Sequence, residues 1–325
     1  MVEFIRVALG TGIVLGIWRG KLQTAPTTAH FLTYFPGKCL ANCQFCPQAK
    51  ESSSDPSMLS RVVWPKCEFD RVIASIEKHG DDFSRICVQA VNYPNVVDDL
   101  LDIISRVKEV CSLPISVACQ PLHAREIEGL VNAGVERIGI ALDAATSELF
   151  EAIKGEKVNS PYSWQTHIRA LEEAKRLAGR ATTHLVVGLG ETEEEMIRTI
   201  QFLHDRGITS ALFAFTPIHG TPLAERPRPD LSSYRRIQLA RYLVVNDLSR
   251  AEKMVFSDGR LVDFGVSDEV LNAAIGGGEP FMTSGCPGCN RPFYNESPMG
   301  PIYNYPRRPT AKELKMIKEQ LGFTH

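Results

Sequence analysis

Short apolar runs alternate with amphipathic helical patterns along most of this chain. Runs rich in β-branched residues predict six buried strands, at His30–Tyr34, Arg85–Ala90, Ile115–Cys119, Arg137–Leu142, Thr183–Gly188 and Ala211–Thr216. Two shorter runs, Lys253–Phe256 and Pro280–Thr283, predict a seventh and an eighth strand. Between the strands, apolar residues at helical spacing predict helices near residues 67–79, 96–110, 124–133, 162–178, 192–206, 231–249 and 267–275.

This alternation is typical of a parallel sheet whose strands are joined by crossover helices. Eight strand–helix units predict an α/β fold of the (β/α)8 TIM-barrel type. Because the last two strands are short, a partial (β/α)6 barrel with a C-terminal tail is the alternative. We expect an N-terminal helical segment over residues 1–28, the barrel over residues 29–283, and a tail over residues 284–325 that ends in a helix.

One helix shows how its ends are encoded. Thr192 and Glu195 have the spacing of a capping box, in which each side chain bonds the other residue's backbone N–H. Gly207 supplies a stop at the other end. We therefore expect a helix between these residues.

The composition favours a cytoplasmic protein with free or metal-bound thiols. The chain has 325 residues and is 44% hydrophobic, and its net charge of −2 predicts neither nucleic acid nor a membrane surface as a partner. Nine cysteines without a secretory signal point to a reducing compartment. The apolar stretch Ile5–Trp18 contains Arg6 and several glycines, so we interpret it as a helix packed on the body of the protein.

The most informative stretch is the thiol loop, Gly37–Gln48, directly after the first predicted strand. Its Cys39, Cys43 and Cys46 are separated by three and then two residues. Three soft thiolates on a tight loop suit an iron–sulfur cluster and leave one iron open for another ligand. A zinc loop, the alternative, normally needs a fourth cysteine or histidine at similar spacing, and none follows nearby.

Other candidate residues follow the predicted strands. In an α/β barrel, chemistry collects at the C-terminal ends of the strands. Cys119 ends the third strand, Asp143 follows the fourth, Gly188–Glu191 follows the fifth, and Ser284–Cys289 follows the eighth. We therefore expect these residues and the thiol loop to meet at one mouth of the barrel.

From about residue 30 to 265 the chain resembles biotin synthase and its relatives in the radical S-adenosylmethionine (SAM) superfamily. The matching stretches occur in the family's order: Cys43–Gln48, Ile86–Ala90, Leu130–Gly134, Ala141–Asp143, Val187–Thr192 and Gly220–Leu223. The resemblance implies that Cys39, Cys43 and Cys46 hold a [4Fe–4S] cluster whose open iron binds SAM. It also implies that SAM contacts Phe45, Ala90, Asp143, Gly188, Glu191 and Ile218, with Asp143 at the ribose.

Biotin synthase also holds a second cluster, on three cysteines and an arginine. Cys87 matches one of these positions and Cys119 lies close to another, but the third falls at Thr182 and the arginine at about Val255. The tail adds a Cys-Pro-Gly-Cys motif, in which Cys286 and Cys289 form a metal-thiolate turn. We expect an auxiliary iron–sulfur cluster there.

The further ligands of that cluster are open at this point. Cys119 is the first candidate because it ends a strand, followed by Cys87 and Cys67. The alternatives for the Cys-Pro-Gly-Cys motif are an unligated turn, a redox pair or a zinc-stapled tail.

Cys286–Pro292 and Tyr303–Pro306 resemble the biotin synthase-related proteins of archaea and some bacteria, which include the subunits of a two-component lipoyl synthase. That resemblance implies a sulfurtransferase that inserts sulfur into a protein-bound octanoyl chain, with the auxiliary cluster as sulfur donor. Expected partners are a lipoyl-type carrier protein or a small acyl substrate, ferredoxin or flavodoxin as electron donor, and a second radical SAM subunit. The alternatives are a biotin synthase-like reaction, methylthiolation, dehydrogenation, or a non-catalytic iron–sulfur scaffold.

Overall fold

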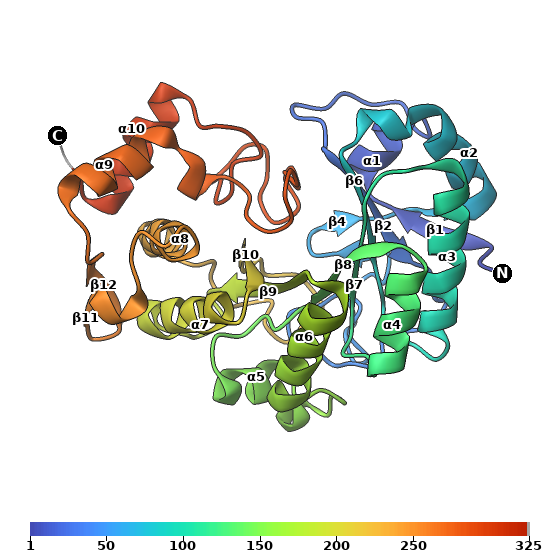
Figure 1. Cartoon of the computed structure of the whole chain (residues 1–325), viewed down its shortest axis with the longest axis horizontal. Coiled ribbons are helices and arrows are strands. Elements are labelled where there is room, and N and C mark those ends of the chain that lie inside the picture. The colour runs from blue at the N-terminus through green and yellow to red at the C-terminus, as the bar shows by residue number, and fades with distance from the viewer. Residues whose placement is uncertain (324–325) are drawn as a thin grey trace.

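The computed structural model describes residues 1–323, and an eight-stranded sheet with flanking helices lies at its centre (Figure 1). Six neighbouring strands of this sheet are parallel. In spatial order they are β10 (Ile208–Ala214), β9 (Ala181–Val187), β8 (Val135–Ile140), β7 (Ile115–Cys119), β6 (Arg85–Gln89) and β2 (Thr28–Thr33). All six predicted strands are therefore present, with ends displaced by a few residues.

Two short antiparallel strands extend the sheet beyond β2. They are β1 (Phe4–Val7), which pairs with β2, and β5 (Lys66–Glu68), which pairs with β1. The predicted helix over Ile5–Trp18 is wrong in its first part: Ile5 and Val7 are buried and alternate with more exposed neighbours, which is the period of a strand. Only α1 (Leu9–Val14) is helical there. A small hairpin joins β3 (Met58–Leu59) to β4 (Val62–Val63).

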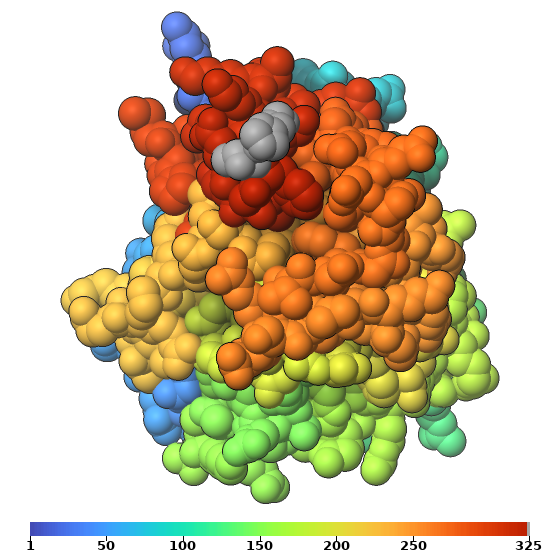
Figure 2. All heavy atoms as spheres, turned by 90° about the vertical axis from the view of Figure 1, so that its left-hand side faces the viewer, coloured from blue at the N-terminus to red at the C-terminus, as the bar shows by residue number. Residues whose placement is uncertain are grey.

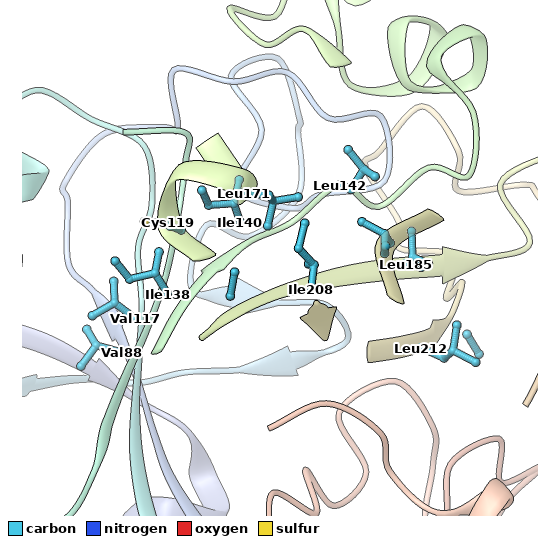
Figure 3. Packing of buried hydrophobic residues seen from close by; sticks show 14 of the residues in the cluster. Val88, Val117, Cys119, Ile138, Ile140, Leu142, Leu171, Leu185, Ile208 and Leu212 are labelled. Carbon is cyan, nitrogen blue, oxygen red and sulfur yellow. The ribbon is translucent and has the colours of Figure 1, made fainter. Parts of the chain in front are cut away.

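The helices connect the parallel strands and shield the sheet. They are α2 (Phe69–His79), α3 (Val96–Val110), α4 (Ala124–Asn132), α5 (Ser147–Ile153), α6 (Trp164–Ala178), α7 (Glu193–Asp205) and α8 (Leu231–Val245). Thr192 and Glu195 form the predicted capping box at the start of α7. The apolar faces of strands and helices meet in one large buried cluster, part of which is shown in Figure 3. None of the helices in residues 1–323 is long and apolar enough to cross a bilayer.

The predicted seventh and eighth strands are not part of the barrel. Asp258 and Gly259 have positive φ and close a separate hairpin of β11 (Val255–Ser257) and β12 (Arg260–Asp263). After α9 (Asp268–Gly277), the chain forms a 3-10 turn at Glu279–Phe281, where proline provides no backbone donor for a sheet. The structure therefore confirms the alternative, a partial (β/α)6 barrel, rather than the closed eightfold barrel.

Residues 284–295, here called the closing segment, cover the open side of this partial barrel. The Leu212 N–H of β10 donates to Ser284 Oγ, and the Thr27 N–H before β2 donates to Asn290 Oδ1. Figure 1 shows this part of the chain passing from the α8 side towards the β6 side, before α10 (Ala311–Leu321). Figure 2, seen from the side of α9 and α10, shows the orange and red C-terminal residues next to the yellow ones.

Arg235 of α8 ties the chain beyond the closing segment to the barrel. Its fully buried guanidinium donates to the backbone oxygens of Ile302 and Tyr303. Replacing Arg235 by methionine leaves the Ile302 oxygen without this donor, while the Tyr303 oxygen keeps only its bond from Gln238, so we expect the free energy of unfolding to fall by about 3 kcal/mol. Chemical denaturation and the rate of proteolysis within residues 284–310 measure the effect.

The matched control is Arg176→Met. Arg176 pairs with Glu173 on an exposed face of α6, and a change below about 0.5 kcal/mol is expected. Equal effects of the two substitutions would contradict the anchoring role of Arg235.

Candidate functional site

A cavity of about 190 Å³ lies inside the partial barrel. Cys46 and Phe45 of the thiol loop line it, as do Cys286 and Cys289 of the closing segment. The thiol loop follows the C-terminal end of β2, whereas Gly288 approaches Thr27, which precedes β2. The expectation that all candidate residues meet at one mouth is thus wrong: the two cysteine groups enter the cavity from opposite ends of the strands.

Backbone hydrogen bonds hold the thiol loop in place. Cys39 N donates to Gln48 O at 3.0 Å and closes the loop on itself. Leu40 N donates to Asn92 O, beyond the end of β6, and Gln44 N donates to Ile153 O at the end of α5. A bond within the loop and bonds to two other segments therefore determine where the thiols lie before any ligand binds.

The three cysteines of the loop are half-buried, and the loss of water around their thiols raises their pKa values. It raises the pKa of Cys46 to about 12 and that of Cys43 well above its usual range. In both cases Lys154 is the cation that opposes the shift. Since soft iron stabilises thiolate and the loop supplies three such donors, the donor set fits a [4Fe–4S] cluster with one open iron.

Lys154 and Asp143 form a buried ion pair next to these thiols. The Lys154 ammonium donates to Asp143 Oδ2 at 2.6 Å and to the backbone oxygen of Ala141. Burial opposes its charge, but Asp143 and Cys43 outweigh that effect and raise the pKa of Lys154. Asp143 lines the cavity with a left-handed backbone, φ 64°, a conformation that aspartate tolerates better than most residues.

The residues expected to contact SAM separate into two groups. Phe45, Asp143 and Ile218 line the cavity. Ala90 does not line it, because Gln89 occupies the inward position on β6. Gly188 and Glu191 lie instead in a shallow groove that also contains Arg226.

Glu191 has a local partner that the sequence motif did not reveal. Its carboxylate accepts hydrogen bonds from three consecutive backbone N–H groups, those of Gly188, Leu189 and Gly190, at 2.6–3.1 Å. Burial outweighs these bonds and raises the pKa of Glu191. The carboxylate therefore shapes the glycine turn after β9.

A second group of thiols occupies the other part of the cavity. Cys87 of β6 lines it together with Cys286 and Cys289. Burial, followed by these two neighbouring thiols, raises the pKa of Cys87 well above its usual range. In the described part of the chain, no three His, Cys, Asp or Glu side chains are grouped for a single metal ion. Three thiols that line one cavity fit an iron–sulfur cluster, which distributes its protein ligands over several irons.

Cys119 and Cys67 do not belong to this group. Side chains alternate across a strand, and on β7 it is Ala118 that lines the cavity. Cys119 lies among apolar side chains of the buried cluster (Figure 3). Cys67 is on edge strand β5, opposite Ile5. The expectation that the Cys119 side chain faces the cavity is therefore wrong, and it is Cys87 that lines the cavity with Cys286 and Cys289.

Sequence reasoning missed two residues of the cavity region. Lys154 directly follows α5, and a lysine is common at the C-terminal end of a helix. The neighbouring sequence therefore does not indicate that Lys154 pairs with Asp143. His30 lies within the buried strand β2, and burial lowers its pKa to about 3. Arg291 of the closing segment also lines the cavity and lies over the ring of Phe213.

Comparison with protein families identifies a radical SAM superfamily match over residues 33–203, just over half of the chain. The chain is 27% identical over 207 residues to biotin synthase of Clostridium botulinum (strain Hall), covering 62% of this chain and 60% of that protein. It is 25% identical over 251 residues to biotin synthase of a Sulfurihydrogenibium species, covering 74% and 71%. The chain thus spans about 60% of the length of the first of these relatives.

Solved structures share the fold at lower sequence identity. Methylornithine synthase matches with a TM-score of 0.51 and 17% identity, over 70% of this chain and 66% of that one. The FeFe-hydrogenase maturase of Carboxydothermus hydrogenoformans matches with a TM-score of 0.51 and 15% identity, over 65% and 49%. These similarities support the partial barrel.

We expect Lys154→Met to destabilise the protein by about 3–5 kcal/mol, because it leaves the Asp143 carboxylate buried without its partner. Chemical denaturation of the metal-free protein measures this loss. The double variant Lys154→Met/Asp143→Asn removes both charges and should recover part of it.

The control is Lys157→Met, which changes an exposed lysine three residues away and should alter stability by less than about 0.5 kcal/mol. A double variant no more stable than Lys154→Met would show that the ion pair is not the source of the effect.

Proposed function

This chain belongs to the radical SAM superfamily, in the group related to biotin synthase, and we propose that it inserts sulfur into unactivated C–H bonds of an acyl chain. One observation carries the proposal: the thiol loop and the second thiol group line the same cavity. A substrate held between them would meet a hydrogen-abstracting centre on one side and a sulfur source on the other. The biotin synthase relatives support this class of reaction.

The residues of the thiol loop would hold the SAM-binding cluster. When bound, this cluster and SAM supply a 5′-deoxyadenosyl radical that removes hydrogen from carbon. Cys39, Cys43 and Cys46 provide its thiolates, and Asp143, oriented by Lys154, provides an acceptor for the ribose hydroxyls of SAM. Phe45 and Ile218 contribute apolar walls that exclude water from the reacting atoms.

The auxiliary cluster would be held by Cys87, Cys286 and Cys289. When bound, it supplies the sulfide that forms the new C–S bond. Hydrogen bonds from β10 and Thr27 to the closing segment hold its two half-buried thiols at the wall of the cavity. These thiols lie across the cavity from the thiol loop, with room for the substrate between the two groups. A sulfide held there would be placed to bond to the substrate carbon that has lost its hydrogen.

The cavity lining favours an acyl substrate. Much of the wall is apolar, from Leu59, Val186, Phe213 and Phe215. A flexible hydrocarbon chain gains free energy by leaving water in such a space. We propose a protein-bound octanoyl chain in lipoyl formation, with a carrier protein, an electron donor such as ferredoxin or flavodoxin, and a second radical SAM subunit as partners. A small acyl substrate, as for biotin synthase-like chemistry, is the second candidate.

The auxiliary cluster can be tested by metal content. We expect Cys286→Ala/Cys289→Ala, after anaerobic reconstitution, to lose iron and sulfide while keeping about four irons per chain and the ability to cleave SAM. Cys119→Ala is the control, because it removes a thiol that lies in the apolar core and outside the cavity. Equal iron content in all three proteins would contradict the auxiliary cluster.

The reaction can be tested by product mass. The reconstituted chain, with SAM and a reductant, should add sulfur to an octanoyl-lysine peptide, alone or with a second radical SAM subunit. Cys43→Ala should abolish both SAM cleavage and product. Cleavage of SAM without sulfur in any acyl product, for both the peptide and small acyl substrates, would contradict sulfur insertion but leave the radical SAM assignment intact.

A further inference from the structure

His30 is a buried histidine in the wall of the cavity, beside the second thiol group. It is 2% exposed, and its Nδ1 has no hydrogen-bond partner among the described residues. Its Nε2 lies 3.7 Å from Cys289 Sγ. Nε2 rather than Nδ1 faces the thiols, and an imidazole nitrogen beside a thiol in a cavity is a donor pair that iron can bind.

The strand register brings His30 to the same level as Cys87. β2 and β6 are parallel neighbours, and His30 is the register partner of Cys87. Strands in a sheet are about 4.8 Å apart, and both residues line the cavity, so their side chains leave the wall side by side. Cys286 and Cys289 face the same space from the closing segment.

Aromatic neighbours hold the ring of His30 in this position. Trp64 contacts it edge to face at a centroid distance of 6.4 Å, and Tyr294 does so at 5.1 Å. The backbone N–H of His30 donates to Thr11 Oγ1, which fixes the chain at this point. The imidazole is therefore oriented by its surroundings, as expected for a ligand held ready to bind.

The separation of Cys289 and His30 fits two ligands of one metal. In a tetrahedral site with metal–sulfur and metal–nitrogen bonds of about 2.3 and 2.1 Å, the two donor atoms lie about 3.6 Å apart. In a [4Fe–4S] cube each iron takes a single protein ligand, whereas each iron of a [2Fe–2S] cluster takes two. A sulfur–nitrogen pair at 3.7 Å therefore matches one iron of the two-iron cluster.

We propose that His30 is a ligand of the auxiliary cluster, sharing one iron with Cys289 in a [2Fe–2S] cluster that Cys87 and Cys286 complete. The inference rests on the proposed function and specifies the type and ligands of its second cluster. In this proposal an imidazole takes the fourth ligand position, where a protein oxygen or a fourth cysteine could otherwise bind. An imidazole ligand also distinguishes histidine-ligated two-iron centres from all-thiolate ones.

The decisive measurement is pulsed electron paramagnetic resonance of the reconstituted, reduced full chain without SAM. With natural-abundance nitrogen we expect a strong 14N coupling typical of iron-bound imidazole, replaced by a 15N coupling when the protein carries 15N-histidine. Iron analysis should give about six irons per chain, four for the SAM-binding cluster and two for the auxiliary one.

Variants assign the signal to a residue. His30→Phe should lose the nitrogen coupling, whereas His184→Leu should keep it. His184 is the control because it also lines the cavity, half-buried, but it lies against Phe213. His30→Cys should bind the two irons of the auxiliary cluster again, but without nitrogen coupling. This recovery would show that the loss in His30→Phe comes from the missing ligand and not from a folding defect.

The outcomes separate this inference from the proposed function. About eight irons with no histidine coupling would overturn the His30 assignment and indicate an auxiliary cube, leaving sulfur insertion in place. About four irons with SAM cleavage intact would overturn both the auxiliary cluster and its ligand. A nitrogen coupling that survives in His30→Phe would assign the ligand to another histidine and refute the proposal.

Discussion

The arrangement of this protein depends on how the open side of a six-stranded parallel barrel is closed. Strand β10 ends the sheet and its unpaired edge needs a partner, whereas β2 already pairs with β1. The closing segment provides one, through Ser284 to Leu212 on one side and Asn290 to Thr27 on the other. Because Cys286 and Cys289 lie within this segment, the same hydrogen bonds that complete the wall place two thiols inside it.

The two-residue period of the strands decides which side chains reach the cavity. His30 and Cys87 face inward at the same level of neighbouring strands, whereas Cys119, one residue beyond the inward Ala118, faces the helices. A difference of one residue in register therefore separates a candidate ligand from a core residue. The histidine and the thiols combine because the strand register aligns them, although no sequence motif connects them.

At the other end of the cavity, the positive charge of Lys154 and the negative charge of Asp143 are paired before any ligand binds. Lys154 is the buried cation that faces the thiol loop, and Asp143 holds it at 2.6 Å. In a low-dielectric interior, one well-placed ammonium strongly influences the thiols around it. The loop itself is fixed by backbone bonds to Asn92 and Ile153, so both the position and the electrostatic setting of the cysteines are prepared by the fold.

The sequence by itself determined the order of strands and helices, the capping box at Thr192, and the thiol loop with its expected cluster. These features depend on periodicity and on spacings of a few residues, which are visible along a single chain. Only the tertiary structure decided that the barrel is partial, that Cys87 rather than Cys119 faces Cys286 and Cys289, and that Lys154 meets Asp143. His30 and Cys289 are 259 positions apart, and contacts of that range arise from packing and strand register, which local patterns do not specify.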